Sequence, residues 1–213
     1  MKIIIPEKNM LNRTNDVDYY NWNYEFPIKY IQLYRFKTIA KLLGDKIYPR
    51  LLEIGTGSGI FLPELAHHCE KLYASDIHPH FENIEQLLKG YHVQNYELKS
   101  QSIEKTDYPD DYFDAIVAVS VLEFVDNLQE ALNEIKRIIK NDGVFLTICP
   151  MNSKILDYIV SFYADKTAKE EFGESRLYVG KALEQNFITV RKGYMLPIVG
   201  KFFPVYTHYK LKK

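Results

Sequence analysis

The chain has 213 residues, about the length of one large domain, and its 27 basic and 28 acidic side chains give a formal net charge of -1. Such a balance provides no overall positive field to gather a phosphate backbone, so the composition argues against a nucleic-acid partner. Two cysteines cannot build a disulfide framework for a domain of this size, and no stretch approaches the roughly 18 consecutive apolar residues of a membrane span.

The N-terminus carries three consecutive apolar residues before Pro6, too few for the core of a signal peptide, and we expect a cytoplasmic protein. Aromatic residues then alternate with Asn and Asp. This composition predicts a loop that becomes ordered when it closes over a ligand, rather than a core strand. We interpret residues 1–45 as this lid and an amphipathic helix, about Tyr30 to Leu43, that anchors it beside the first strand. The aromatic residues of the lid are Tyr19, Tyr20, Trp22, Tyr24 and Phe26.

Short apolar runs alternate with longer helical stretches between residues 50 and 150, which is the βαβ pattern of a parallel sheet. The run from Phe113 to Ser120 is almost continuously apolar, as expected for a central strand covered on both faces. The next helix begins at Asn127, which can cap it with Glu130 three residues on, and ends at Asn141-Asp142-Gly143. The other predicted strands are 50–54, 72–75, 96–100 and 144–148, and the other predicted helices are 60–69 and 81–89.

The remaining residues, 151–213, are expected to supply helices on the substrate side and a closing pair of strands. The predicted order is an amphipathic segment (153–163), a charged stretch (165–176), a short helix (179–185) and two strands (187–194 and 205–211). Leu196 to Pro204 joins the two strands, and a connection this short favours an antiparallel pair. We expect the whole chain, 1–213, to form one domain around the core at residues 50–150.

A glycine loop follows the first strand in the sequence Glu53-Ile-Gly55-Thr-Gly57-Ser-Gly59. A loop of this kind lets a ligand approach the backbone closely. Its spacing is G-x-G-x-G, whereas a dinucleotide loop more often reads G-x-G-x-x-G, so it fits an adenosine ligand without a pyrophosphate better than NAD. Asp76 lies 21 residues after Gly55, at the end of the second strand, where a carboxylate can accept hydrogen bonds from ribose hydroxyls.

From Leu51 to Pro150 the chain resembles the class I S-adenosylmethionine-dependent methyltransferases, in particular the small-molecule branch with an E-x-G-x-G-x-G loop. The resemblance implies a Rossmann-like α/β fold with helices on both faces of a seven-stranded, mostly parallel sheet, in the order 3-2-1-4-5-7-6 with strand 7 antiparallel. It also implies that the loop cradles S-adenosylmethionine, that Asp76 holds the ribose, and that Glu53 lies near the amino-acid part of the cofactor.

The resemblance continues at Gln101-Ser102-Ile103-Glu104, where the family commonly has an acidic residue against the adenine amino group. Ser102 stands at that position, so adenine recognition falls to Ser102 or to the backbone of Ile103. The segment from Ser120 to Val125 resembles the family's L-E-H-V, with Phe124 in place of His, so the base mechanism of relatives does not transfer. The predicted cofactor-binding residues are Glu53, Gly55, Thr56, Gly57, Gly59, Asp76, Ile77, Ser102, Ile103 and Ser120; we assign no catalytic residue.

Several of these residues have a second interpretation. Asp76 can be a solvated carboxylate, Glu53 a partner for loop amides, and Ser102 an ordinary turn residue. The six histidines have no metal-ligand spacing and are expected mostly at the surface, although His78 and His80 could border the adenine. Cys149 is expected to be a buried structural thiol. No D/N-P-P-Y sequence is present, which disfavours methylation of DNA amino groups.

We therefore predict transfer of a methyl group from S-adenosylmethionine to a small-molecule acceptor. The pocket should lie beyond the carboxyl ends of the strands, covered by the lid, by 153–177 and by 196–204. The aromatic lid, together with Leu196, Ile198, Val199, Phe202 and Phe203, suits an apolar or aromatic acceptor, unless these residues close the core or make a homodimer contact. The alternatives are a catalytically silent cofactor-binding module and a nicotinamide-dependent oxidoreductase.

Overall fold

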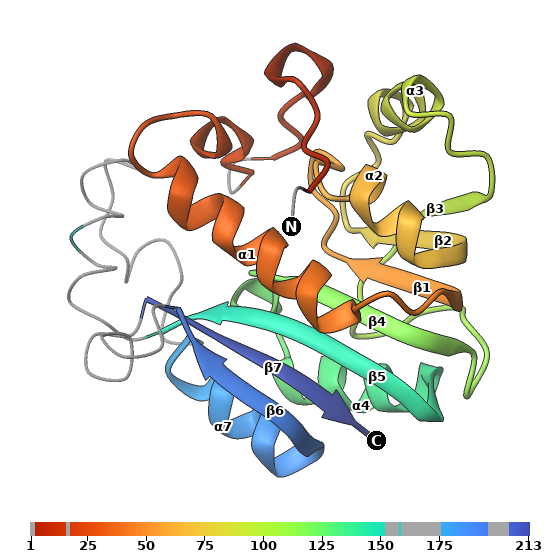
Figure 1. Cartoon of the computed structure of the whole chain (residues 1–213). Coiled ribbons are helices and arrows are strands. Elements are labelled where there is room, and N and C mark those ends of the chain that lie inside the picture. The colour runs from red at the N-terminus through yellow and green to blue at the C-terminus, as the bar shows by residue number, and fades with distance from the viewer. Residues whose placement is uncertain (1–2, 16–17, 152–157, 159–175, 196–204) are drawn as a thin grey trace.

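The computed structural model describes residues 3–15, 18–151, 158, 176–195 and 205–213 (Figure 1). Seven strands form one sheet in the order β3-β2-β1-β4-β5-β7-β6, with β1 to β5 parallel and β7 antiparallel to both of its neighbours. The predicted strand order and the predicted direction of strand 7 are confirmed. The strands are β1 (Tyr48–Ile54), β2 (Cys69–Asp76), β3 (Tyr96–Ser100), β4 (Phe113–Val119), β5 (Ile139–Pro150), β6 (Ile188–Tyr194) and β7 (Tyr206–Lys212).

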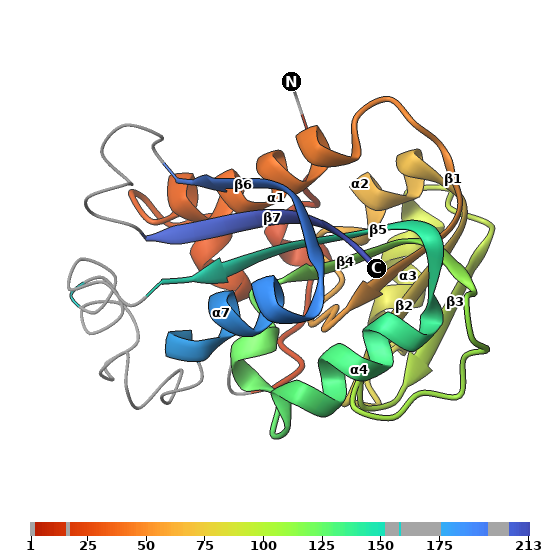
Figure 2. The ribbon, with the colours of Figure 1, turned by 90° about the horizontal axis from the view of Figure 1, so that it is seen from below.

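Helices cover both faces of the sheet, as Figure 2 shows for α1 on one side and α4 and α7 on the other. Strand side chains alternate between two apolar clusters, so that Leu51 and Val117 face one cluster while Leu52 and Ile116 face the other. Burying one such side chain stabilises the fold by about 1.5–3 kcal/mol relative to leaving it exposed. The first cluster contains α1 (Lys29–Leu43), α2 (Leu62–Leu65) and α3 (Glu82–Gly90), and the second contains α4 (Leu128–Ile138) and α7 (Arg176–Asn186).

Two predicted helices have other bounds in the structure. The helix after the glycine loop was predicted over 60–69, but α2 begins at Leu62, because the residues before it form a turn in which the Leu62 amide donates to the Gly59 carbonyl. At the other end, Cys69 is already extended and starts β2. The helix α4 ends at Ile138 rather than at Asn141-Asp142-Gly143. Its last residues are drawn into the sheet, because Ile139 pairs with Phe113 of β4 and the Tyr112 amide donates to the Ile138 carbonyl at 2.8 Å.

The predicted start of α4 is confirmed, since the Asn127 side-chain oxygen accepts a hydrogen bond from the Glu130 amide at 3.2 Å. The short helix predicted over 179–185 lies within α7, and the two closing strands form the predicted antiparallel pair. The segments 153–157, 159–175 and 196–204 lie outside the described residues. Within the described part of the chain, no helix is long and apolar enough to cross a membrane.

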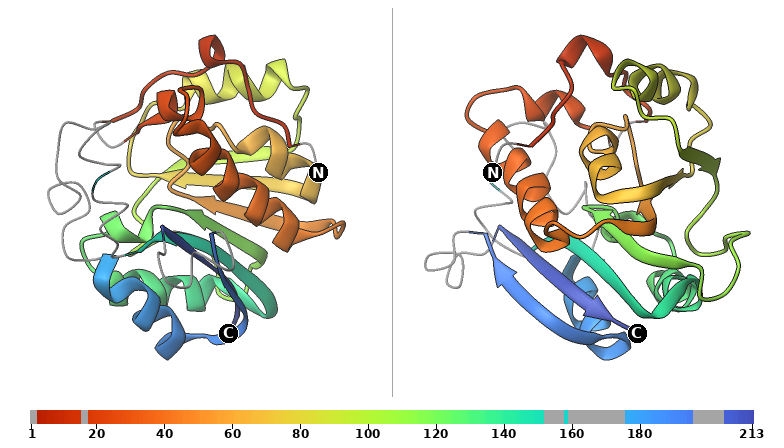
Figure 3. Two further views of the ribbon diagram at one scale, coloured as in Figure 1. Left: turned by 60° about the vertical axis from the view of Figure 1, so that its left-hand side comes forward. Right: turned by 45° about the vertical axis from the view of Figure 1, so that its right-hand side comes forward.

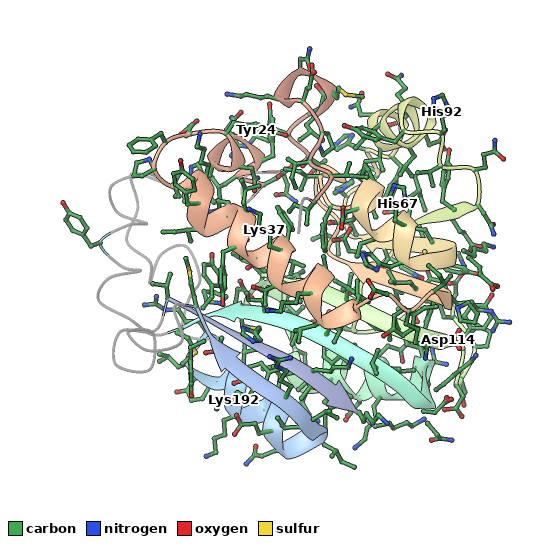
Figure 4. The ribbon with its side chains drawn as sticks, viewed as in Figure 1. Tyr24, Lys37, His67, His92, Asp114 and Lys192 are labelled. Carbon is green, nitrogen blue, oxygen red and sulfur yellow. The ribbon has the colours of Figure 1, made fainter. Side chains whose placement is uncertain are left out.

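The N-terminal segment crosses one end of the sheet between α1 and α3 (Figures 1 and 3). Its first part is tied to the body of the protein, because the Ile4 amide donates to the Glu64 carboxylate at 2.7 Å and Leu11 is buried. The Tyr24 hydroxyl donates to the Pro6 carbonyl at 2.6 Å, which closes the segment into a loop (Figure 4). The described residues between these contacts, 12–15 and 18–23, therefore belong to an N-terminal loop whose two ends are fixed.

Candidate functional site

A cavity of about 380 Å³ lies beyond the carboxyl ends of β1, β2 and β4 and beneath the N-terminal loop. The chain leaves β1 toward β2 on one side, while β4 pairs with β1 on the other, so the strand order reverses at this point. Ligands of open α/β sheets bind at such a reversal. The cavity is thus where the fold by itself predicts a ligand.

The glycine loop forms one wall of the cavity. Gly55 has a φ of +68°, its amide donates to the Ser75 carbonyl at 2.8 Å, and Val121 occupies the space that a side chain at Gly55 would need. Gly57 has a φ of +50° and faces the side chain of Asp18. These left-handed conformations favour glycine, and they leave the loop backbone open to the cavity.

Asp76 ends β2 beside this loop, where its carboxylate accepts hydrogen bonds from the Gly57 amide at 2.8 Å and the His78 amide at 3.3 Å. His78 is buried, and its Nε2 lies 2.9 Å from the Gly57 carbonyl. The expectation of a surface position was wrong for His78, because it supports the loop from behind. Neither His78 nor His80 is among the described residues that line the cavity.

Glu53 lies on the cavity floor at the end of β1 and is 3% exposed. Its carboxylate accepts a hydrogen bond from the Thr56 hydroxyl at 2.9 Å. Burial, with a smaller contribution from the nearby Asp76 charge, raises the pKa of Glu53 to about 8. A positively charged ligand would favour the ionised form of this carboxyl group.

Asp18, from the N-terminal loop, is a third carboxyl group on the cavity wall and was not predicted from the sequence. It accepts hydrogen bonds from the Thr14 amide at 3.1 Å and the Thr14 hydroxyl at 3.0 Å. Burial raises the pKa of Asp18 despite these bonds, and the Asp76 charge adds to the shift. With Asp18, Glu53 and Asp76 on one cavity, this end of the site favours a cation.

The segment after β3 lines the cavity through Gln101, Ser102, Ile103 and Glu104. The Ser102 hydroxyl donates to the Glu104 carboxylate at 3.0 Å and accepts from the Glu104 amide at 3.2 Å. Ser102 is therefore a turn residue that also faces the cavity, so both of its interpretations stand. Glu104 supplies a carboxylate two residues beyond the position where the family commonly has one.

Ser120 follows β4 with a φ of +54°, a conformation that is uncommon for a residue with a side chain and clusters at functional sites. Its amide donates to the Ile148 carbonyl at 2.9 Å, and its buried hydroxyl oxygen has no hydrogen-bond partner among the described residues. Phe124 also lines the cavity, so the residue that replaces the family's histidine faces the site.

Nine of the ten predicted cofactor-binding residues line this cavity, including Ile77, which is 74% exposed. Gly59 does not; a side chain there would meet Ile84 at 3.1 Å and Leu62 at 3.3 Å. Gly59 therefore allows the loop to pack closely against α2 and α3.

The predicted lid divides into two parts. Tyr19, Tyr20 and Trp22 line the cavity, and the Tyr19 and Trp22 rings are stacked with centroids 4.4 Å apart. Tyr24 instead bonds to Pro6, and Phe26 is 76% exposed, so neither reaches the cavity. The apolar residues predicted to help from 196–204 lie outside the described residues.

Further lining residues come from elements that no motif connects to the site: Gln32, Arg35 and Phe36 of α1 and Tyr206 of β7. No sequence signal marks them, because only folding brings residues 32 and 206 to the end of β4. Cys149 is buried, as expected, and burial raises the pKa of its thiol. The described residues contain no group of three or more metal-binding side chains.

Comparison with known protein families finds a match over the core of the chain. The model of a methyltransferase domain matches residues 52–147, which include the loop, Asp76 and Ser120. The match and the structural neighbours support a class I S-adenosylmethionine-dependent methyltransferase domain over these residues. S-adenosylmethionine is the cofactor of this family.

Solved structures share the fold of this chain at low sequence identity. A SAM-dependent methyltransferase from Aquifex aeolicus has a TM-score of 0.65 and 21% identity, over 84% of this chain and 89% of that one. The N-methyltransferase NodS from Bradyrhizobium japonicum, in complex with S-adenosyl-L-homocysteine, has a TM-score of 0.63 and 15% identity over 93% of each chain. At these identities the likeness concerns the fold alone.

Among curated proteins, the chain is 25% identical over 150 residues to a malonyl-[acyl-carrier protein] O-methyltransferase of Bacillus cytotoxicus, covering 68% of this chain and 51% of that enzyme. It spans only 5% and 3% of two large fungal synthases that it also matches. The chain thus corresponds to about half, or much less, of these relatives.

Proposed function

We propose that the protein transfers a methyl group from S-adenosylmethionine to a small-molecule acceptor bound in the same cavity. The observation that carries the proposal is the meeting of the glycine loop, Asp76 and Glu53 on one cavity at the reversal of strand order. A likeness to relatives with known acceptors does not identify this acceptor, because the identities are low and the coverage is partial.

The residues of the cavity fit the cofactor. The buried hydroxyl oxygens of Ser58 and Ser120 have no hydrogen-bond partner among the described residues, and both residues line the cavity. The left-handed backbone of Gly57 leaves room beside the Asp76 carboxylate. Glu53 and Asp18 suit the ammonium group of the amino-acid part. A ligand with ribose hydroxyls and an ammonium group would satisfy these groups together.

In the proposed roles, Asp76 accepts the ribose hydroxyls, Glu53 lies near the amino-acid part, and Ser102 and Ile103 border the adenine. The backbone of Gly55, Thr56 and Gly57 and the side chains of Ile77 and Ser120 complete the cradle, with Gly59 supporting the loop. When bound, the cofactor supplies a methyl group on a sulfonium. The chain itself holds the acceptor in line and excludes water, which Tyr19, Tyr20 and Trp22 favour as an apolar cover.

Calorimetric titration with S-adenosylmethionine, S-adenosylhomocysteine and NADH tests the cofactor. We expect the first two to bind and NADH not to bind. Replacement of Asp76 by Ala should weaken the binding of S-adenosylmethionine by roughly 1.5–3 kcal/mol, the range for hydrogen bonds to a charged group. Asp76→Asn keeps the shape and serves as the control for folding. Unchanged affinity in folded Asp76→Ala protein would remove this residue from the ribose role.

A catalytically silent cofactor-binding protein is the second candidate, and Phe124 favours it because a ring without a proton-transferring group faces the cavity. Release of S-adenosylhomocysteine during a screen of apolar and aromatic acceptors separates the two candidates. Cofactor binding without turnover of any acceptor would favour the silent module. NADH binding would instead support the oxidoreductase.

A further inference from the structure

The cavity has a second polar end, of which the proposed cofactor roles use only Ser120. It is formed by Arg35 of α1, Ser120 after β4 and Tyr206 at the start of β7. Tyr206 pairs with Pro150 at the end of β5, so this end lies over β4, β5 and β7. Asp76 belongs to β2, on the other side of β1 in the sheet. The two polar ends are therefore separated across the strand reversal.

Arg35 brings a positive charge to this second end, and no acidic side chain of the described residues pairs with it. Its guanidinium carbon lies 5.7 Å from the centroid of the Tyr206 ring and 5.4 Å from that of Phe36. Its Nε is buried and has no hydrogen-bond partner among the described residues, none of which forms an ion pair with it. A half-buried guanidinium with an unmade hydrogen bond is costly, and such groups mark ligand sites.

Glu123 is an acidic group on which the Arg35 charge acts, but no ion pair joins the two residues. It is 3% exposed, and both carboxyl oxygens lack hydrogen-bond partners within the described part of the chain. Burial raises the pKa of Glu123 to about 8, although the Arg35 charge opposes the shift. At neutral pH this carboxyl group is mostly protonated, so Arg35 keeps its net positive charge.

The hydroxyl groups beside Arg35 complete a set of donors. The Ser120 oxygen is buried without a partner among the described residues, and Tyr206 is 5% exposed and lines the cavity. A guanidinium with neighbouring hydroxyls matches a planar carboxylate, which can accept two parallel bonds from arginine. The Asp76 carboxylate would repel an anion from the opposite end.

We propose that Arg35, with Ser120 and Tyr206, binds a carboxylate of the methyl acceptor, so that the acceptor is an apolar or aromatic carboxylic acid. The inference rests on the proposed function. The carboxylate faces Arg35 at the β4–β7 end, and the apolar body lies under Tyr19 and Trp22. Arg35 orients the acceptor and selects acids over neutral molecules of the same shape.

Trp22 makes the test direct, since it is the single tryptophan of the chain and lines the same cavity. Its fluorescence is followed while hexanoate or 4-phenylbutanoate is added to protein saturated with S-adenosylhomocysteine, and hexanamide and 4-phenylbutanamide are the neutral counterparts. The acids should bind at least about tenfold more tightly than the amides, as expected for a charged hydrogen-bonded pair.

Arg35→Gln should remove this preference, because the acids should bind about tenfold more weakly or worse while the binding of the amides stays nearly unchanged. Arg35→Lys should retain part of the preference for acids. Lys37→Gln is the matched control, because Lys37 is exposed two residues further along α1 and does not line the cavity (Figure 4). Circular dichroism and the S-adenosylhomocysteine affinity of each variant report whether the fold is intact.

Equal binding of acids and amides, or no binding of either acid to the loaded wild-type protein at about 20 mM, would overturn the proposal. A tenfold loss of affinity for S-adenosylhomocysteine in Arg35→Gln would also overturn it, if the affinity for 5′-methylthioadenosine, which lacks the amino-acid part, were unchanged. Arg35 would then hold the cofactor's own carboxylate. If wild-type protein binds no cofactor, the proposed function fails separately, and the same acids and amides are compared on the free protein.

Discussion

Gly57 is the residue on which the shape of the cofactor wall depends most. Its φ is +50°, and a Cβ at this position would lie 3.7 Å from the Asp18 carboxyl group. Gly57→Val should reduce S-adenosylhomocysteine binding about 100-fold or more, because a branched side chain disfavours this conformation and fills ligand space. Isothermal calorimetry measures the loss, with circular dichroism as the check on folding.

The matched control is Gly44→Ala. Gly44 also has a left-handed φ, +70°, but it ends α1 in open space and does not line the cavity. This variant should lose about 1–3 kcal/mol of stability, because a ψ of −154° places Gly44 in a region that essentially only glycine adopts, and it should bind the cofactor normally. Wild-type affinity in Gly57→Val would mean that the loop is structural and does not face the ligand.

Glu53 links stability to pH. Its pKa is raised from the ordinary 4.5 to about 8, so between these values the folded protein keeps a proton that the unfolded chain has released. The free energy of unfolding should therefore fall as the pH rises from about 5 to about 8. Urea unfolding at several pH values measures this slope, and Glu53→Gln should make it shallower. The slope should not vanish, because Glu123 has a similar pKa. An unchanged slope in the variant would contradict the raised pKa of Glu53.

Among the elements, the N-terminal loop is the one that we propose closes over bound ligands. Its ends are fixed near Leu11 and Tyr24, while Tyr19, Tyr20 and Trp22 line the cavity. S-adenosylhomocysteine should slow tryptic cleavage after Arg13, and Trp22→Ala should damage methyl transfer more than cofactor affinity. Gel electrophoresis of timed digests and paired kinetic and binding measurements test this.

Point variants suit this test better than removal of residues 1–23, because such a deletion would also remove the buried Leu11. Phe26→Ala is the control, since Phe26 is aromatic and 76% exposed but does not line the cavity. Equal cleavage rates with and without the ligand, together with normal transfer by Trp22→Ala, would leave these aromatic residues as packing or contact residues.

At the scale of the whole molecule, we propose that residues 1–213 unfold as one unit. The two apolar clusters lie on opposite faces of one sheet. Loss of either cluster would therefore expose one face of the sheet that supports the other cluster. Calorimetry should show one thermal transition with equal calorimetric and van't Hoff enthalpies. S-adenosylhomocysteine at 100 times its Kd should stabilise the protein by about 2.7 kcal/mol. Two separable transitions, only one of them shifted by the ligand, would contradict a single domain.

The fold of the core was predictable because its signals are local. Strands such as Phe113–Val119 are buried on both faces and appear as apolar runs, and Asn127 caps α4 through its own side chain. Helix ends were less predictable, since pairing between Phe113 and Ile139 draws residues after Ile138 into the sheet. Such a pairing joins positions 26 apart and leaves no periodic trace in the sequence.

The sequence by itself determined the order of the sheet, the glycine loop and Asp76, because each depends on neighbouring residues or on a family motif. Only the tertiary structure brought Asp18, Arg35 and Tyr206 to the same cavity. These residues lie on a loop, a helix and the last strand, and their spacing carries no signal. The physical reason is that the site forms where parallel strands end and the chain from both termini folds over them, so its charges depend on burial that no stretch of sequence expresses.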